Sequence, residues 1–228
     1  MKTRLIFVRH AEAEGNINRH FHGWTNSNIT EKGHLQAEKL GQRFKNIDVD
    51  VIYSSSLNRT LQTASYIAKV KNLPIIRTDK LKEINGGDWE NQLWDELPIK
   101  WPEEYDTWEN RPHAHKMPNG ETMEEFLQRL EKEIIYIAEN NKGKNVCIVT
   151  HGTAIRALTC LFYGWPLEDM IKVQWQDNTA ITIVDYEDGK FKMILEGDVS
   201  HLDCETRTIE NQEWWKKLKD TMFSGGNK

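Results

Sequence analysis

Short apolar runs and longer amphipathic segments alternate along most of this chain. The runs cover residues 5–8, 49–53, 74–76 and 146–149, and most of their residues are aliphatic. Runs this short, bounded by polar residues, are typical of strands buried on both faces of a sheet. The pattern therefore predicts a sheet with at least four buried strands.

The segments between the runs carry apolar residues at helical spacing. One helix is expected over residues 30–46 with Thr30 as its N-cap, and a second from the serines at 54–56 to about residue 70. A third is expected over residues 121–139, and a fourth begins near Thr153. This alternation predicts an α/β fold, a three-layer α/β/α sandwich with a mainly parallel central sheet.

Two segments depart from the alternation. Residues 86–120 carry four prolines among tryptophans and acidic residues, which predicts an irregular, partly helical insertion. Residues 180–186 and 191–196 flank an Asp-Gly pair at 188–189, a strong hairpin signal. The polar end contains Trp214-Trp215, which we expect to dock on the body of the protein or on a partner subunit. We expect a single domain over residues 1–228.

Composition argues against several classes of partner. The formal net charge is −5 and no basic run is present, which speaks against nucleic acid and against a membrane surface. No apolar run approaches the length of a bilayer span, and the N-terminus enters a strand without a signal-peptide pattern. The three cysteines are far apart, as expected for reduced thiols in a cytoplasmic protein. A homodimer is compatible with the sequence.

Histidines and arginines follow the predicted strands. Arg9-His10 ends the first, and Thr150-His151-Gly152 follows the run at residues 146–149. Carboxyl ends of parallel strands meet at one edge of an open sheet, where ligands bind. Arg59 begins a helix, whose N-terminal amides favour an anion. The sequence therefore predicts a site that holds an oxyanion beside an imidazole nucleophile.

Six segments, in their order along the chain, resemble those of the histidine phosphatase superfamily, also called the phosphoglycerate mutase-like fold. They match its first arginine–histidine motif, the lead into its first helix, its second arginine motif, its acidic motif, its second histidine motif and a segment near the end. These segments are Arg9-His10-Ala11-Glu12 with Asn16, residues 22–33, residues 54–64, residues 81–90, Thr150-His151-Gly152 and residues 196–201. The resemblance covers nearly the whole chain and is closest to broad-specificity phosphatases.

The resemblance implies an enzyme that hydrolyses phosphomonoesters of small metabolites through a phosphohistidine. His10 would be the nucleophile, and Glu83 the general acid and then the general base. That role requires a raised pKa for Glu83 or an acidic pH optimum. Arg9, Arg59 and His151 would surround the phosphate oxygens. Because these groups can neutralise a phosphate, no metal or cofactor is expected.

Four further residues are expected to bind phosphate or substrate: Asn16, His22, Gly23 and Gly152. The partner would be a small-molecule phosphate ester. The insertion at about residues 86–120 would cap this site and specify the leaving group, so the physiological substrate is left open.

The chain departs from the family pattern near the expected site. Ala11 stands where the family usually has glycine, and it would be strained if that position required a positive φ. His22 replaces a more usual glutamine, and Asn28-Ile29 a Pro-Leu pair, which affects substrate identity more than reaction class. Asn91 stands where a glycine often follows the Trp-Glu pair.

Two other functions are weighed against hydrolysis. A phosphoglycerate mutase would carry an Arg-rich, Tyr-containing continuation after Glu83, whereas here the continuation is Ile-Asn-Gly-Gly-Asp-Trp at residues 84–89. The second alternative to hydrolysis is a non-catalytic phosphate-binding or interaction module on the same fold. His113 and His115 are expected to be exposed loop residues rather than metal ligands, and His201 either structural or at the rim of the site.

Overall fold

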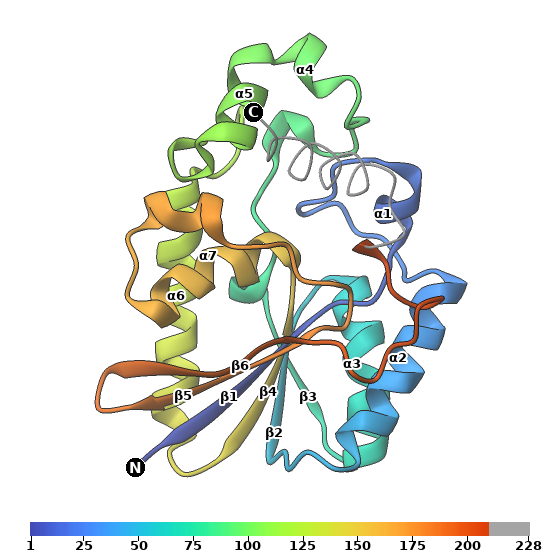
Figure 1. Ribbon diagram of the computed structural model, residues 1–228, viewed down its shortest axis with the longest axis vertical. Helices are drawn as coiled ribbons and strands as arrows, with labels where there is room; N and C mark the ends of the chain where they lie inside the picture. Colours follow the sequence, from blue (N-terminus) through green and yellow to red (C-terminus); the bar gives the residue numbers. More distant parts are fainter. Residues whose placement is uncertain (210–228) are drawn as a thin grey trace, which may run out of the picture.

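The computed structural model describes residues 1–209, which are built around one six-stranded sheet with the order β3-β2-β4-β1-β5-β6 (Figure 1). Strands β1 to β4 run parallel, whereas β5 pairs antiparallel with β1 and β6 antiparallel with β5. The strands are β1 (Thr3–Arg9), β2 (Val51–Ser55), β3 (Ile75–Thr78), β4 (Asn145–Thr150), β5 (Ile181–Glu187) and β6 (Lys190–Asp198). The expected mainly parallel sheet is confirmed.

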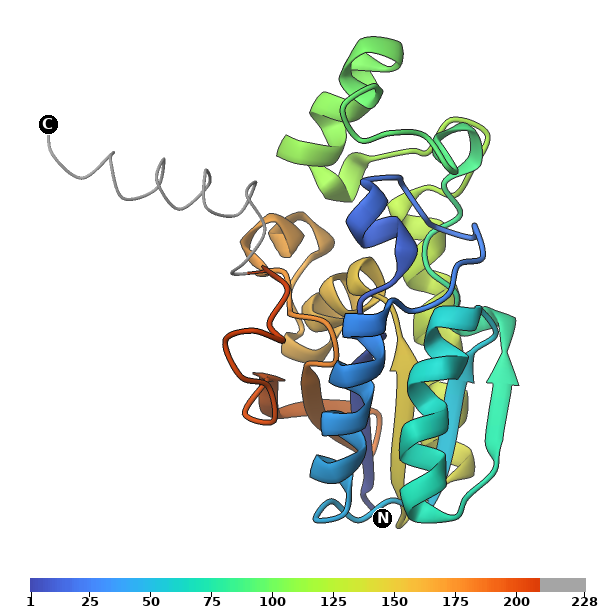
Figure 2. The same ribbon diagram turned by 90° about the vertical axis from the view of Figure 1, so that its right-hand side faces the viewer.

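Helices cover both faces of this sheet, which gives three layers (Figure 1 and Figure 2). On one face, Ile6 and Val8 of β1 share a core with residues of α2 (Glu31–Phe44) and α3 (Asn58–Lys71). On the other, Leu5 and Phe7 share a core with α6 (Met123–Asn140) and α7 (Gly152–Tyr163). Successive side chains of a strand point to opposite faces, so the continuous apolar run of β1 serves both cores.

Capping residues fix where two of the helices begin. The Thr30 hydroxyl accepts the Gly33 N–H at 3.0 Å, so the expected N-cap of α2 is confirmed. Helix α6 begins with a capping box, in which the Thr122 hydroxyl accepts the Glu125 N–H and the Glu125 carboxylate accepts the Thr122 N–H.

The expected start of α3 at the serines was too early. Ser54 and Ser55 belong to β2, because they still pair with β3, and α3 begins after Leu57, whose side chain makes no cap. The loop at residues 11–29 holds a short helix, α1 (Glu14–Asn18), that was not expected. Its five residues are too few to show a helical period.

The Asp-Gly pair forms the expected hairpin between β5 and β6. Asp188 and Gly189 both have positive φ, 51° and 78°. Two successive residues with positive φ are typical of the type I′ turn, whose twist matches that of the flanking strands.

The insertion at residues 86–120 is partly helical, as expected. It holds α4 (Leu97–Lys100) and α5 (Pro102–Asn110) at the end of the molecule far from the N-terminus (Figure 1). Short 3-10 turns complete the chain: η1 (Asp79–Leu81), η2 (Gly87–Trp89), η3 (Pro112–Ala114) and η4 (Leu167–Lys172).

An aromatic cluster joins this insertion to Phe21. Trp89 and Trp108 are buried, and their rings contact each other and Phe21 at centroid distances of 5.8–6.1 Å. His115 is 1% exposed and packs 5.0 Å from the Trp89 ring, so the expectation that it is exposed was wrong. The sequence could not show this, because His115 contacts aromatic rings that are distant along the chain. Trp214-Trp215 lies outside the described residues.

Candidate active site

The two predicted strand-end histidines lie side by side. His10 follows β1 and His151 follows β4, which are neighbours at the centre of the sheet with Arg9 opposite Thr150. The His10 N–H donates to the Thr150 carbonyl at 2.9 Å and extends this ladder by one residue. Both side chains are buried, and their ring centroids are 5.3 Å apart. The sheet therefore delivers two imidazoles to one point at its carboxyl edge.

A backbone contact sets the tautomer of His10. Its Nδ1 lies 2.7 Å from the carbonyl oxygen of Ala11, which can only accept, so Nδ1 carries the proton. The lone pair is then on Nε2. Burial, Arg59 and Arg9 all lower the pKa of His10 well below its ordinary value. This shift favours the neutral, nucleophilic form of the imidazole.

Two buried arginines flank this histidine. Arg59, in the first turn of α3, donates from Nη2 to Gly23 O at 2.7 Å and from Nη1 to Thr25 O at 2.9 Å. Burial lowers its pKa to about 10, so it keeps its charge at neutral pH. Arg9 donates from Nη1 to the carbonyl of Gln176. Both guanidinium groups are anchored by backbone oxygens.

Glu83 faces the start of α7. Its Oε1 accepts the Ile84 N–H and its Oε2 the Thr153 N–H, each at 3.0 Å. Burial raises the pKa of this carboxyl and outweighs the two amides and Arg59, which lower it. The raised pKa has the direction expected from the sequence. Such a carboxyl can hold a proton and release it near working pH.

Two buried nitrogen atoms at this edge have no hydrogen-bond partner among residues 1–209. One is Nε of Arg9 and the other is Nδ1 of His151, whose Nε2 lies 2.8 Å from the Ser55 hydroxyl. A Cβ at position 152 would lie 3.3 Å from Arg9 Nε, so Gly152 leaves this edge of the guanidinium accessible. Buried polar groups seldom remain unpaired in proteins. An oxyanion would accept from the Arg9 Nε–H, and from His151 Nδ1 when that nitrogen carries the proton.

The other predicted binding residues line the same region. Asn16 uses Oδ1 to accept the Ala13 N–H at 2.9 Å, which leaves its Nδ2 to donate. His22 is half-buried, and its carbonyl accepts from Arg59 at 3.2 Å. A Cβ on Gly23 would lie 2.2 Å from the carbonyl oxygen of Ile84, so only glycine lets the loop pass the segment that carries Glu83.

Two departures from the family pattern fit their surroundings. Ala11 does not have a positive φ, so alanine causes no strain there, and its methyl group packs with Ile29 and Ala37. Asn91 has a φ of 61°, a conformation that glycine and asparagine adopt most easily. Its side chain is also a hydrogen-bond partner of His22.

The loop before β5 contributes support that sequence reasoning missed. Asn178 donates from Nδ2 to the His10 carbonyl at 2.8 Å, and the Thr179 N–H donates to the Arg9 carbonyl at 3.1 Å. The Thr179 hydroxyl lies 3.1 Å from His201 Nε2, so His201 contacts this loop. No motif marks these residues. Only the pairing of β5 with β1 brings them to the nucleophile.

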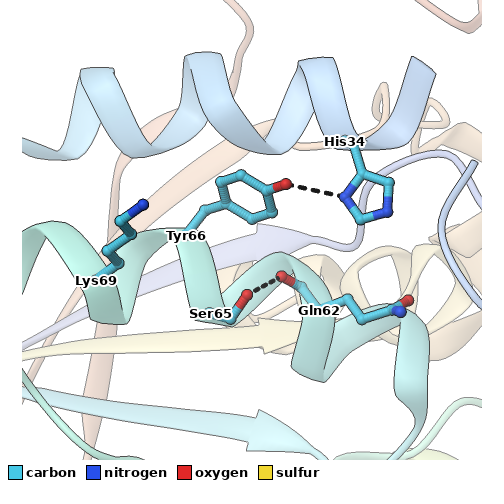
Figure 3. Close-up of a pocket in the computed structure, with 5 residues that line it drawn as sticks. All are labelled: His34, Gln62, Ser65, Tyr66 and Lys69. Carbon is cyan, nitrogen blue, oxygen red and sulfur yellow. Dashed lines mark hydrogen bonds between the residues drawn. The ribbon is translucent and has the colours of Figure 1, made fainter. Parts of the chain in front are cut away.

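Two further features lie apart from this edge. A surface pocket of about 270 Å³ is lined by His34 of α2 and four residues of α3, with the Tyr66 hydroxyl 2.9 Å from His34 Nδ1 (Figure 3). It contains none of the residues at the strand ends. Within residues 1–209, no three His, Cys, Asp or Glu side chains are grouped so that they could hold a metal ion.

Known proteins share this chain's sequence and architecture. Residues 5–199 match the histidine phosphatase superfamily (branch 1). Phosphoserine phosphatase 1 of Hydrogenobacter thermophilus is 31% identical over 203 residues, which are 88% of this chain and 94% of that protein. The probable phosphoglycerate mutase GpmB of Salmonella arizonae is 31% identical over 210 residues, 88% of this chain and 95% of that protein.

A solved structure, YhfR of Bacillus stearothermophilus, has a TM-score of 0.85 at 33% identity and covers 88% of this chain and 100% of that one. The family match begins within β1 and ends just after β6, and positions 9, 10, 59 and 151 fall inside it. The chain belongs to the histidine phosphatase superfamily.

Proposed function

We propose that this protein hydrolyses phosphomonoesters of small metabolites through a phosphohistidine on His10. The observation that carries the proposal is the environment of that side chain. A neutral imidazole with its proton on Nδ1 lies among the buried charges of Arg9 and Arg59 and shares the sheet edge with the carboxyl of Glu83, whose pKa is raised. These are the parts that a phosphoryl transfer without a metal requires.

In the first step, Nε2 of His10 attacks phosphorus in line with the leaving oxygen. The bond from phosphorus to that oxygen breaks, and Glu83 gives its proton to the departing alcohol. Arg9, Arg59 and His151 stabilise the charge on the remaining oxygens, and such electrostatic stabilisation is most of what an enzyme contributes to this reaction. Nδ1 keeps its proton, held by the Ala11 carbonyl.

In the second step, Glu83 takes a proton from a water molecule, whose oxygen attacks the phosphohistidine. The bond from phosphorus to nitrogen breaks and inorganic phosphate leaves. His10 is neutral again and Glu83 is protonated again, so the cycle closes without an added acid or base.

Replacing His10 tests the mechanism. We expect His10→Ala to lower the rate of p-nitrophenyl phosphate hydrolysis by about 10⁴-fold or more, because no nucleophile remains. His34→Ala, which changes a histidine of the surface pocket in Figure 3, is the matched control and should hydrolyse like wild type. Equal hydrolysis by His10→Ala and wild type would exclude the phosphohistidine. Failure of wild type on every ester would instead favour a non-catalytic phosphate-binding module.

The substrate is sought with a phosphate-release screen in the presence of EDTA. The panel includes phosphoserine, since a relative is named as a phosphoserine phosphatase, together with sugar phosphates and phosphoglycerates. EDTA should leave the rates unchanged, because the guanidinium charges of Arg9 and Arg59 offset the charge of the phosphate without a metal. A loss of activity that added metal restores would contradict this mechanism.

Phosphoglycerate mutase activity is the second candidate, because one relative is named a probable phosphoglycerate mutase. A mutase keeps its phosphoryl group and returns it to the substrate. The next two carboxylates after Glu83 are occupied elsewhere, Asp88 by the Asn119 amide and Glu90 by backbone amides. Hydrolysis is therefore favoured. Mutase turnover that exceeds phosphatase turnover after priming with 2,3-bisphosphoglycerate would reverse the assignment.

We infer that the enzyme works in the cytoplasm on soluble esters and does not bind nucleic acid. The net charge of −5 and the buried thiols of Cys147 and Cys160 support this. None of the helices in residues 1–209 has the length and apolar character that a bilayer crossing requires. Fractionation of the source cells tests the location. Recovery of the protein with membranes or in an oxidised compartment would contradict it.

A further inference from the structure

We propose that Glu90 is a positioning residue, which holds Arg59 in place for the phosphate through the backbone of the loop between them. We call this loop, residues 22–26, the Gly23 loop. The inference rests on the proposed function only in taking Arg59 as a phosphate ligand.

Glu90 lies directly after the buried Trp89, and it binds the Gly23 loop from one side. Its Oε1 accepts the Trp24 N–H at 2.6 Å. Its Oε2 accepts the Thr25 N–H at 2.9 Å and the Thr25 hydroxyl at 2.5 Å. A fourth donor, the Gly86 N–H, approaches Oε1 at 2.9 Å. Three amides and one hydroxyl thus hold this half-buried carboxylate in one place.

Arg59 binds the same loop from the other side. Its guanidinium donates to Gly23 O at 2.7 Å and to Thr25 O at 2.9 Å. The Gly23 carbonyl and the Trp24 N–H belong to one peptide unit, which is planar and rigid. That unit therefore accepts from a cation at its oxygen and donates to an anion at its nitrogen. Each of these charge-assisted bonds polarises the peptide and strengthens the other.

The Gly23 loop also connects the phosphate side of the site with the acid side. A Cβ on Gly23 would lie 2.5 Å from Glu90 Oε1, and Trp24 donates from Nε1 to the Glu83 carbonyl at 2.8 Å. If the loop moved toward Glu90, it would lose its hydrogen bonds to Arg59. If it moved toward Arg59, it would lose its hydrogen bonds to Glu90. By holding the loop, Glu90 therefore fixes the orientation of the Arg59 guanidinium. An arginine that is already fixed loses less conformational entropy when it binds a phosphate.

A double-mutant cycle on phosphate binding tests this role. The variants are Glu90→Gln, Arg59→Lys and the pair, and calorimetry measures the dissociation constant for inorganic phosphate. Lysine keeps the positive charge but cannot bond two carbonyls as a fork. We expect Glu90→Gln to weaken phosphate binding about tenfold in the wild-type background, as for a lost charge-assisted hydrogen bond. In the Arg59→Lys background we expect Glu90→Gln to weaken phosphate binding by less than about twofold.

Equal weakening in both backgrounds, or a change below about twofold in wild type, would overturn the inference. If Glu90→Gln does not fold, Thr25→Val replaces it in the cycle. That substitution removes only the hydroxyl bond to Oε2 and should weaken phosphate binding about threefold, again only when Arg59 is present.

Asp185→Asn is the control for loss of a paired carboxylate. Asp185 accepts two bonds from Arg4 at the far end of β1, so its replacement should lower stability but leave phosphate binding unchanged. The cycle measures binding and not turnover. Coupling without wild-type hydrolysis would therefore reject only the proposed function, and hydrolysis without coupling would reject only the role of Glu90.

Discussion

At the scale of single residues, two titratable groups of the site are shifted in opposite directions. Burial and two arginines lower the pKa of His10, whereas burial raises the pKa of Glu83. The shifts favour the unprotonated imidazole and the protonated carboxyl, so the pH ranges of these two forms move toward each other. A nucleophile and an acid can then act together, which is the usual use of such opposed shifts.

This arrangement predicts a bell-shaped dependence of kcat/KM on pH. Activity falls at low pH as His10 gains a proton below its lowered pKa, and at high pH as Glu83 loses its proton above its raised pKa. We expect Glu83→Gln to remove the alkaline limb and to lower kcat/KM for an alkyl phosphate by about 10²- to 10³-fold. The loss should be smaller for p-nitrophenyl phosphate, because a nitrophenolate leaves without a proton.

Glu109→Gln is the matched control for this pH profile. Burial also raises the pKa of Glu109, which lies on α5 in the insertion, and its replacement should leave the alkaline limb in place. An alkaline limb that persists in Glu83→Gln, or an equal loss for both leaving groups, would show that Glu83 is not the acid.

Sequence motifs pointed to the residues that we propose as catalytic, but not to the groups that support them. His10, Glu83 and His151 stand in recognisable motifs. Asn178, Thr153 and Ser55 each contact one of these three residues through a single hydrogen bond. A serine at a strand end or an asparagine before a strand is common in any α/β protein. Their contacts follow from strand pairing, and nothing in the local sequence marks them.

At the scale of elements, periodicity and caps predicted most helices, and errors arose where tertiary pairing extended or replaced the local pattern. α2 and α6 begin at capping threonines with apolar stripes behind them. β2 runs on through two serines because β3 pairs with them, and α1 is too short for a pattern. A boundary that is set by the element's own side chains can therefore be predicted from the sequence. A boundary that is set by pairing with another element cannot.

The capping box of α6 makes a stability prediction. Thr122→Ala removes the hydroxyl that accepts the Glu125 N–H, and we expect the free energy of unfolding to fall by about 1 kcal/mol in urea denaturation. Thr107→Ala in the exposed part of α5 is the control and should have little effect, since alanine favours a helix interior. An equal loss in both variants would argue against a specific cap.

At the scale of the whole molecule, one apolar core joins the sheet to the insertion. Leu5 and Phe7 of β1 belong to the same buried cluster as Trp89 and Trp108. The proline-rich composition of residues 86–120 predicted an irregular insertion but not this continuity. The contacts of Trp108 reach Phe21, Trp89 and His115, and no period relates these positions.

The shared core predicts that body and insertion unfold together. We expect Trp108→Ala to lower the free energy of unfolding by about 3–5 kcal/mol, because it leaves a cavity in a buried aromatic cluster. Tryptophan fluorescence and far-ultraviolet circular dichroism should follow one transition. Trp165→Ala, at a 42% exposed side chain, should cost about 1 kcal/mol or less. Two separate transitions would show that the insertion is an independent domain.

The hydrogen bond from Asn178 to the His10 carbonyl has a consequence for the order of synthesis. The two residues are 168 positions apart, so the ribosome makes the nucleophile long before the group that supports it. During translation His10 is already present while β5, which brings Asn178 and Thr179 to the edge of β1, does not yet exist. We therefore expect hydrolysis to require synthesis of residues 178–179 and pairing of β5 with β1, so that recovered turnover reports a late stage of folding.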